Sequence, residues 1–393
     1  MKTLFYLLLS LGLAYNSAAQ PYNIGHRQVT FIDADRNDRL ILTEIYYPSV
    51  TEGDNVPVAG ENGTAFPVLV FGHGFVLEWG AYANFWTNLV PQGYIMAFPR
   101  TETDLSPDHT DFGQDIAFLV KIIQQEGENP KSPFFEKVDS TSCVMGHSMG
   151  GGSSFLSIQY NPSITAIVNF AAAETNPSAI ATCSSISIPA LVFAGGNDCI
   201  TPPETNQILM YNSLASPCKT LIEINGGSHC QFAEQNTLCS FGELTCQPAP
   251  DIERDFQHRM VDTLLGPWLD YYLKGNCNAS TAFQDLLHSS FAWSFEQQCE
   301  PCTPLSATSE DKEGQRFRLF PLPSTGNFYI ETRLEIPQLI VRIYDIKGGL
   351  VFLDQMESGK DCCFEVQSHL SPGIYSVEIV HAEQVTILKL IVQ

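Results

Sequence analysis

A five-residue motif, Gly146-His147-Ser148-Met149-Gly150, constrains the fold of this chain more than any other segment. It follows a short apolar run, residues 143–145, and opens into a stretch of small residues. An apolar run predicts a buried strand, and the small residues allow a helix to approach that strand closely. We therefore expect a tight strand–turn–helix in which Ser148 Oγ stands clear of the sheet. The alternative is an ordinary glycine-rich turn, and the rest of the chain decides between the two.

Two later segments share one arrangement: an apolar run, then glycines, then a titratable residue. Residues 190–198 end in Asp198, and residues 221–229 end in His229. A serine hydroxyl becomes a good nucleophile when a histidine removes its proton and an acid orients that histidine. The chain order serine, acid, histidine is that of α/β-hydrolases, so we predict Ser148, Asp198 and His229 as the catalytic residues. Glu174 is the alternative acid, and a turn aspartate and a surface histidine are the structural alternatives.

Acyl transfer also needs two backbone donors for the developing oxyanion. Residues 68–71 form an apolar run that leads into Gly72-His73-Gly74-Phe75. We expect the N–H groups of Phe75 and Met149 to supply these donors. His73 is a rival for the general base that we interpret as structural, and His147 is expected to shape the pocket.

Other motifs favour no metal ion and no cofactor. Residues 108–111 read Asp-His-Thr-Asp, which resembles a metal cluster but precedes a helical pattern and is interpreted as helix capping. The sequence holds no glycine-rich phosphate loop, so no nucleotide cofactor is expected.

The remaining pattern predicts strands that alternate with helices, which is typical of a mostly parallel sheet covered on both faces. A hairpin is expected over residues 27–48, and a helix over 255–273 with a kink at Gly266-Pro267. Further strands are expected at 68–71, 94–98, 164–170, 190–193 and 221–224, and further helices at 111–125 and 205–214. After residue 316 only short strands are expected, which predicts a small antiparallel β-sandwich.

Composition and the chain ends indicate an exported protein. The formal net charge of -23 argues against nucleic acid as a partner. Residues 1–19 have a basic start, a short apolar core and small residues at their end, as in a signal peptide, and no segment is long and apolar enough to span a membrane. We expect a catalytic domain over 20–298, a linker over 299–316, a second domain over 317–393, and a monomer.

Twelve cysteines agree with export, because disulfides persist outside the cytoplasm. The cysteines expected in disulfides are Cys199, Cys218, Cys230, Cys239, Cys246, Cys277 and Cys299. Cys299 and Cys302 have C-x-x-C spacing in a polar segment, which favours a disulfide between them. A zinc site at Cys239 and Cys246 is the weaker alternative, and Cys143 is expected to be a buried free thiol.

Residues from about 25 to 275 resemble a group of secreted α/β-hydrolases. This group contains dienelactone-hydrolase-like enzymes, bacterial cutinases and poly(ethylene terephthalate) hydrolases. The segments that carry the resemblance are Gly74-Phe75, Gly146 to Gly150, Gly196-Asn197-Asp198 and Glu223 to His229. The resemblance implies a Ser148–His229–Asp198 triad and oxyanion donors at Phe75 and Met149. It also implies a disulfide between the acid and histidine loops, with Cys199 paired to Cys230. Pairing of Cys199 with Cys218 is the alternative.

The chain departs from that family in two places. Residues 171–175, Ala-Ala-Ala-Glu-Thr, lack the tryptophan that the family usually carries there, which disfavours aromatic polyesters. Trp79 and the aromatic residues after it are candidates for the pocket wall, and Glu174 near the pocket disfavours anionic substrates. The segment 230–250 is longer and richer in cysteine than the family's loop, so we expect it to rebuild the pocket rim.

Residues 317–393 resemble the type A sorting domain of type IX secretion substrates. The segments that carry this resemblance are 320–328, 343–349, 371–375 and 389–392. The alternative is a carbohydrate-binding sandwich, against which the lack of tryptophan after Trp293 counts. The resemblance implies passage through the type IX machinery and a secreted or cell-surface protein.

Together these features predict a secreted serine esterase that acts on carboxylic esters of short acyl chains or on polyesters. A lipase or peptidase of the same fold is the alternative within enzymes. A catalytically inactive, surface-displayed binding protein is the alternative from another class.

Overall fold

The computed structural model describes residues 22–299, except 62 and 291, and residues 317–392, except 321–323, 325–326, 333–337, 346–348, 358–362, 369, 372 and 382–383. The chain divides into two compact units, Met1–Cys302 and Thr303–Gln393. The predicted signal peptide and, apart from Cys299, the predicted linker lie outside the described residues.

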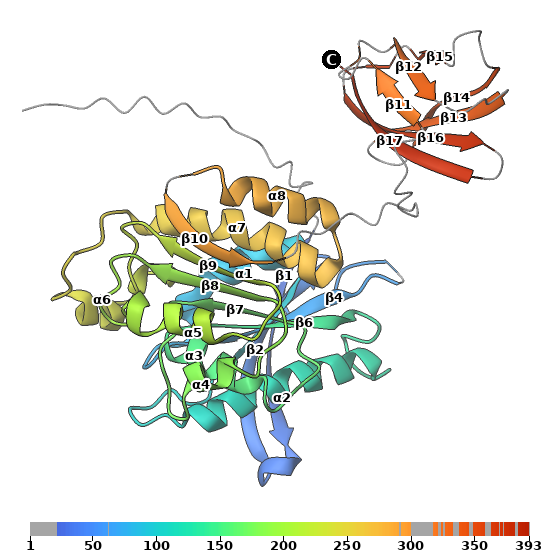
Figure 1. Cartoon of the computed structure of the whole chain (residues 1–393). Coiled ribbons are helices and arrows are strands. Elements are labelled where there is room, and N and C mark those ends of the chain that lie inside the picture. The colour runs from blue at the N-terminus through green and yellow to red at the C-terminus, as the bar shows by residue number, and fades with distance from the viewer. Residues whose placement is uncertain are drawn as a thin grey trace, which may run out of the picture. The chain divides into compact units, whose positions relative to one another are not determined.

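The described part of the first unit is built on a ten-stranded sheet (Figure 1). Its strands are β1 (Asn23–Asp33), β2 (Arg39–Ser49), β3 (Gly53–Asp54), β4 (Phe66–Gly72), β5 (Ile95–Pro99), β6 (Val138–His147), β7 (Ala166–Phe170), β8 (Ala190–Gly195), β9 (Lys219–Ile224) and β10 (Trp293–Gln298). The spatial order is β10-β9-β8-β7-β6-β4-β5-β2-β1-β3. Strands β5, β4, β6, β7, β8 and β9 pair in parallel, whereas β10 and the β1–β2 hairpin pair antiparallel at the two sides.

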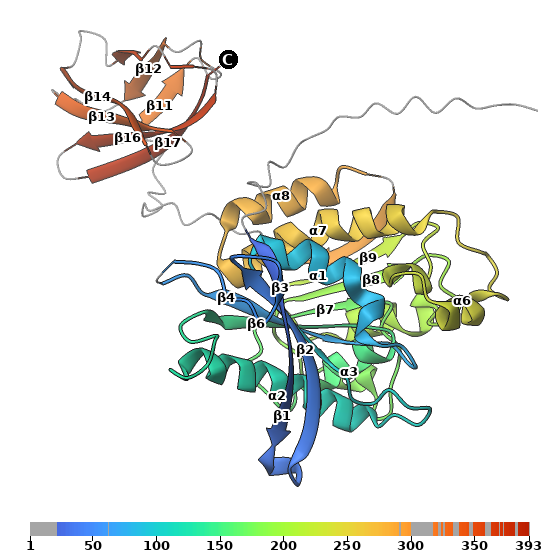
Figure 2. The same cartoon turned by 180° about the vertical axis from the view of Figure 1, so that it is seen from behind.

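Helices cover both faces of this sheet, as Figures 1 and 2 show. The α-helices are α1 (Ala83–Leu89), α2 (His109–Glu128), α3 (Met149–Ser157), α4 (Ala179–Cys183), α5 (Gln207–Ser213), α6 (Thr237–Glu243), α7 (Arg254–Lys274) and α8 (Cys277–Leu287). Short 3-10 helices are η1 (Ala34–Arg36), η2 (Trp79–Tyr82), η3 (Val90–Gln92), η4 (Pro203–Thr205) and η5 (Cys230–Phe232). Helices α1, α7 and α8 lie on one face, and α2 to α5 on the other.

The two faces of the sheet hold separate apolar cores. Strand β4 contributes side chains to both cores, which explains why its sequence is apolar throughout. Leu69 and Phe71 pack into the core under α1 and α7, whereas Val68 and Val70 pack into the core under α2. Successive side chains of a strand point to opposite faces, so a strand covered on both faces carries no polar side. The predicted mostly parallel α/β-hydrolase sheet is confirmed.

Two predicted helix features, the cap before α2 and the glycine–proline pair in α7, can be compared with the structure. Asp108 caps α2, because its carboxylate accepts hydrogen bonds from the N–H groups of Thr110 and Asp111. The motif at 108–111 is therefore a helix cap, as expected. Helix α7 runs through Gly266-Pro267 to Lys274 without interruption and ends at Gly275, which has a left-handed conformation. No helix in the described part of the chain is long and apolar enough to cross a membrane.

The described part of the second unit contains two antiparallel sheets. Its strands are β11 (Phe317–Phe320), β12 (Asn327–Thr332), β13 (Gln338–Tyr344), β14 (Leu350–Glu357), β15 (Cys363–Gln367), β16 (Gly373–His381) and β17 (Gln384–Val392). The sheets have the orders β11-β12-β15 and β14-β13-β16-β17. Phe328 and Phe364 from the first sheet share a core with Val341, Val377 and Leu390 from the second. The predicted small antiparallel β domain is confirmed, while parts of the motifs that suggested it, including 321–323 and 346–348, lie outside the described residues.

Candidate active site

Ser148 lies at the sharp turn between β6 and α3. Its φ of 56° and ψ of −122° lie outside the conformations that most residues adopt. The turn depends on two glycines, because a Cβ atom on Gly146 would overlap the carbonyl of Gly150, and one on Gly150 would overlap that of Gly72. The backbone N–H of Ser148 donates to the carbonyl of Phe170 at 3.1 Å, which fixes the turn to β7. The glycine-rich motif is therefore a strained strand–turn–helix rather than an ordinary turn.

Asp198 and His229 follow β8 and β9, which are neighbouring parallel strands. His229 Nδ1 donates to Asp198 Oδ2 at 2.8 Å, and both side chains are buried. Since the carboxyl ends of parallel strands meet at one edge of a sheet, the loops after β6, β8 and β9 bring Ser148, Asp198 and His229 to the same side of the molecule. The alternative acid, Glu174, is exposed and accepts a hydrogen bond from the N–H of Ile180.

Thr201 supports the acid and was not identified from the sequence. The N–H groups of Ile200 and Thr201 both donate to Asp198 Oδ1 at 2.8 Å. The Thr201 hydroxyl lies 2.9 Å from Asp198 Oδ2 and 3.0 Å from His229 Nδ1. These contacts hold the carboxylate in one orientation with its charge directed at His229. A threonine three residues after an aspartate gives no sequence signal, because such pairs are common in turns.

Helix α7 holds the loop that carries His229. The buried amide of Gln257 accepts from the N–H of Ser228 at 3.0 Å and donates to the carbonyl of the same residue at 3.0 Å. Arg254 donates to the carbonyls of Cys230 and Ala233 on the other side of His229. Both contacts lie more than twenty positions away in sequence, so only the fold reveals them.

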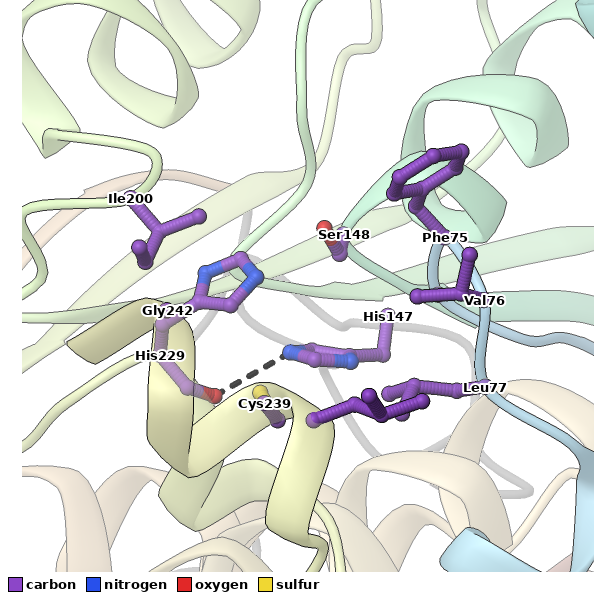
Figure 3. A pocket seen from close by; sticks show the side chains of 11 residues that line it. Phe75, Val76, Leu77, His147, Ser148, Ile200, His229, Cys239 and Gly242 are labelled. Carbon is purple, nitrogen blue, oxygen red and sulfur yellow. Dashed lines mark hydrogen bonds between the residues drawn. The ribbon is translucent and has the colours of Figure 1, made fainter. Parts of the chain in front are cut away.

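Ser148 and His229 open on one pocket of about 150 Å³, shown in Figure 3. Gly74, Phe75 and His147 also line it, together with residues 76–77, Ile200, Leu238, Cys239 and Gly242. In the described residues, Ser148 Oγ and His229 make no hydrogen bond with each other. Catalytic hydrogen bonds of this kind are often long until substrate binds. Leu238, Cys239 and Gly242 come from the segment after His229, so this segment contributes to the rim of the pocket.

His147 connects the two sides of the pocket. The N–H of Gly74 donates to the Tyr82 hydroxyl at 2.7 Å, which leaves the hydroxyl hydrogen for His147 Nδ1 at 3.0 Å. His147 Nε2 then donates to the carbonyl of His229 at 3.1 Å. Burial, and then the neighbouring His229, lower the pKa of His147 well below its usual value, so the ring stays neutral. The expectation that His147 shapes the pocket agrees with this arrangement.

The other three residues considered from the sequence, Trp79, Glu174 and His73, do not line the pocket. The indole N–H of Trp79 donates to the Tyr46 hydroxyl, and the Arg100 guanidinium covers its ring. His73 is buried, with its ring nitrogens on the carbonyls of Gly74 and Thr101, and burial lowers its pKa.

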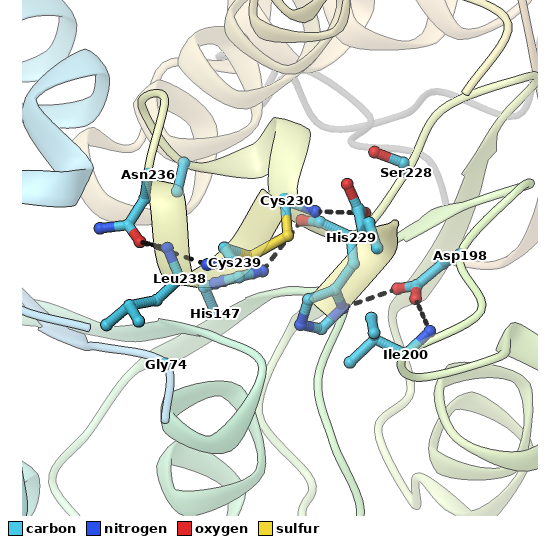
Figure 4. The surroundings of a disulfide bond; sticks show 12 residues. Gly74, His147, Asp198, Ile200, Ser228, His229, Cys230, Asn236, Leu238 and Cys239 are labelled. Carbon is cyan, nitrogen blue, oxygen red and sulfur yellow. Dashed lines mark hydrogen bonds and ion pairs between the residues drawn. A yellow bond between two sulfur atoms is a disulfide. The ribbon is translucent and has the colours of Figure 1, made fainter. Parts of the chain in front are cut away.

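The predicted disulfide pairings are wrong. Cys199 pairs with Cys246 and Cys230 pairs with Cys239, so neither Cys199–Cys230 nor Cys199–Cys218 forms. The reason is the segment after His229, which carries Cys239 and Cys246 and reaches both loops (Figure 4).

The remaining cysteines correct one further prediction and confirm another. Cys299 pairs with Cys218 and not with Cys302, because β10 runs beside β9 and brings Cys299 to the start of that strand. Cys277 is also disulfide-bonded. Cys143 is a buried free thiol, as predicted, and Cys183 is another.

Comparison with known proteins identifies the class. Residues 17–244 match the family model described as PET hydrolase-like, so this chain belongs to that family. Residues 318–393 match the secretion system C-terminal sorting domain, which confirms the predicted type IX sorting domain and identifies a secreted or cell-surface protein.

Individual relatives are more distant. The chain is 26% identical over 187 residues to Cutinase 1 of Thermobifida cellulosilytica, which is 47% of this chain and 64% of that protein. It is 27% identical over 195 residues to a bis(hydroxyethyl) terephthalate hydrolase of Streptomyces coelicolor, which is 49% of this chain and 56% of that protein. The chain thus spans less than two thirds of the length of these relatives.

Proposed function

We propose that this protein is a secreted carboxylic ester hydrolase that works through an acyl-enzyme on Ser148. The observation that carries the proposal is the strained turn that presents Ser148 to the pocket that His229 also lines. His229 Nδ1 lies 2.8 Å from Asp198 Oδ2. Relatives named cutinase and bis(hydroxyethyl) terephthalate hydrolase support the same reaction class.

The proposed reaction follows from this arrangement. Ser148 Oγ attacks the ester carbonyl carbon while His229 Nε2 takes the hydroxyl proton, and Asp198 stabilises the imidazolium that forms. The carbonyl oxygen becomes an oxyanion facing the N–H groups of Phe75 and Met149. Met149 is the first residue of α3, so its N–H has no acceptor within the helix, which supports this role. His229 then protonates the leaving alcohol, and water cleaves the acyl-enzyme by the same steps.

The proposed substrates are uncharged esters of small or aliphatic acyl groups, including aliphatic polyesters. A pocket of about 150 Å³ is close in size to a cavity that holds one benzene ring, so it accepts one acyl unit at a time. The apolar side chains of Val76, Leu77 and Ile200 line it. We further propose that the C-terminal unit engages the type IX secretion machinery.

Ser148→Ala tests the catalytic assignment. The variant should lose nitrophenyl butyrate hydrolysis by a factor of about 10⁴ or more, because the nucleophile is gone while the fold is unchanged. Labelling by a fluorophosphonate probe should disappear with it. Labelling of the parent at another serine, or activity retained by the variant, would contradict the assignment.

A further inference from the structure

The loop after β7, which begins at Ala171, lies against the turn that carries Ser148. The N–H of Ala173 donates to the carbonyl of Ser148 at 2.9 Å. A Cβ atom on Gly152 of α3 would overlap the carbonyl of Ala173, so the glycine allows this close approach. Ala171 has a positive φ of 45°, which is unfavourable for a residue that carries a Cβ atom. Contacts from elsewhere must therefore hold this loop in place.

Two buried side chains from the segment after Asp198 contact the carbonyl groups of this loop. The Thr201 hydroxyl lies 3.1 Å from the carbonyl oxygen of Ala171. Gln207, the first residue of α5, donates from Nε2 to the carbonyl of Ala172 at 2.7 Å and to Thr201 Oγ1 at 3.2 Å. Thr201 is 5% exposed and Gln207 is fully buried. The loop after β7 is thus tied to the segment that carries the candidate acid.

The Thr201 hydroxyl is the point at which these contacts meet the acid–base pair. It lies 2.9 Å from Asp198 Oδ2 and 3.0 Å from His229 Nδ1, beside the contact between those two residues that Figure 4 shows. A hydroxyl has one hydrogen and two lone pairs. The Asp198 carboxylate and the Ala171 carbonyl only accept, so the hydrogen serves one of them. The oxygen then faces the N–H groups of Gln207 and His229, which keeps the His229 hydrogen on Nδ1 and leaves Nε2 free to accept a proton.

Gln207 has a feature that packing alone does not explain. Its Oε1 atom is buried and has no hydrogen-bond partner among the described residues. A buried carbonyl oxygen without a partner is unfavourable, so packing alone would favour an apolar side chain of the same length. The Nε2 group of the same amide, in contrast, makes both contacts with Thr201 and the loop after β7. The amide is therefore placed for its donors, which act on the site.

We propose that Gln207 and Thr201 are positioning residues that couple the turn of the nucleophile to the acid–base pair. The inference rests on the proposed function, since it concerns the geometry of the same reaction. Parallel strands bring the loops to one edge of the sheet, and these two side chains set the distances between the loops. Neither residue lines the pocket, so their loss acts on the alignment of the reacting groups and not on substrate binding.

The test uses variants of the full chain that keep the shape of a side chain and remove its hydrogen bonds. Thr201→Val removes the hydroxyl, and Gln207→Met removes the amide. Each should lower kcat for nitrophenyl butyrate about tenfold and change KM less than about twofold. Thr201→Ser keeps a hydroxyl and should retain kcat within about threefold of the parent value. Urea unfolding establishes which variants are folded, and if Gln207→Met does not fold, Thr201→Val and Thr201→Ser decide the outcome.

Gln159 and Thr182 form the matched control pair, because they make the same contact elsewhere. Gln159 Nε2 donates to Thr182 Oγ1 at 2.8 Å, and that hydroxyl donates to the carbonyl of Ser178 at 3.0 Å. Thr182 is 7% exposed, and neither member of the pair lines the pocket. Gln159→Met and Thr182→Val should keep the parent kcat.

The double variant Thr201→Val/Gln207→Met should lose less activity than the product of the two single losses, because Gln207 acts through Thr201. An unchanged kcat in Thr201→Val or in folded Gln207→Met, equal losses in the control pair, or single losses that simply multiply would overturn this inference and leave the proposed function intact. A parent that hydrolyses no ester and does not react with a fluorophosphonate probe would overturn the proposed function, and this inference with it.

Discussion

At the scale of single residues, Tyr82 joins parts of the site that are far apart in the sequence. Its hydroxyl accepts from the N–H of Gly74, next to Phe75, and donates to His147, whose other nitrogen contacts the backbone of His229. Tyr82 is fully buried, and burial raises its pKa, so the hydroxyl keeps its proton. We interpret Tyr82 as a positioning residue for the loop that carries the proposed oxyanion donor.

Tyr82→Phe should therefore lower kcat for nitrophenyl butyrate about tenfold with little change in KM, because a small displacement of an oxyanion donor acts mainly on the transition state. It should also destabilise the fold by about 1–3 kcal/mol, since the Gly74 N–H and His147 Nδ1 lose a buried partner. Steady-state kinetics and urea unfolding measure the two effects.

Tyr47→Phe is the matched control. Tyr47 on β2 is also buried, and its hydroxyl donates at 2.8 Å to the carbonyl of Val56, which follows β3 and does not line the pocket. This variant should lose stability and keep the parent kcat. The positioning role is contradicted if the two variants have the same kcat.

The candidate catalytic residues can be predicted from sequence, and the residues that hold them cannot. Ser148, Asp198 and His229 each follow an apolar strand by a few positions, so the chain direction alone places them at one edge of a parallel sheet. Thr201, Tyr82 and Gln257 act through contacts set by the folded loops and helices. Nothing in their local sequence distinguishes them from residues of ordinary turns and cores.

At the scale of elements, the contact between α1 and α7 contains a carboxyl group in an unfavourable environment. Asn88 Nδ2 on α1 donates to Asp262 Oδ1 on α7 at 2.7 Å. Burial raises the pKa of Asp262 to about 7, and the hydrogen bond from Asn88 opposes that rise. In the unfolded chain the pKa of an aspartate is about 3.9. Between these values the folded protein binds a proton that the unfolded chain releases, so stability falls as pH rises from about 4 to about 7.

Asp262→Asn should remove this dependence, because the amide keeps the shape and does not ionise. The variant should match the parent near pH 4 and exceed its free energy of unfolding by about 2–4 kcal/mol near pH 8. Urea unfolding at several pH values measures the difference. Asp285→Asn removes a charge from an exposed position on α8 and corrects for general charge effects. A difference between Asp262→Asn and parent that is constant with pH would refute the prediction.

Elements differ in how well the sequence predicts them, and the reason is physical. The central strands and α2 have long, regular apolar patterns, and their positions agree with prediction to within a few residues. Helix α6 is seven residues long and buries none of them, so its few apolar residues do not distinguish it from a loop in the sequence. Strand β10 alternates exposed and partly buried residues at a sheet edge. The disulfide pairings depend on where α6 lies, which explains why they were predicted wrongly.

At the scale of the whole molecule, the two units have separate apolar cores. Among the described residues, the cores of the first unit extend to Trp293 and Phe295, and the core of the second unit begins at Phe317. The Cys218–Cys299 bond closes the first unit by tying the start of β9 to the residue that follows β10. Compact units that have their own apolar cores generally fold independently.

A chain ended after Cys302 should therefore keep nitrophenyl butyrate turnover within about twofold of the full chain and show the same unfolding midpoint for the first unit. A chain ended after Leu287 is the contrasting variant, because it lacks β10 and Cys299. Loss of the Cys218–Cys299 bond alone should cost about 2–5 kcal/mol, and loss of the strand should expose the edge of β9.

Calorimetry of the full chain should show two transitions, one of which disappears in the chain ended after Cys302. A single cooperative transition in the full chain, or loss of activity on removing only the second unit, would show that the two units depend on each other for folding.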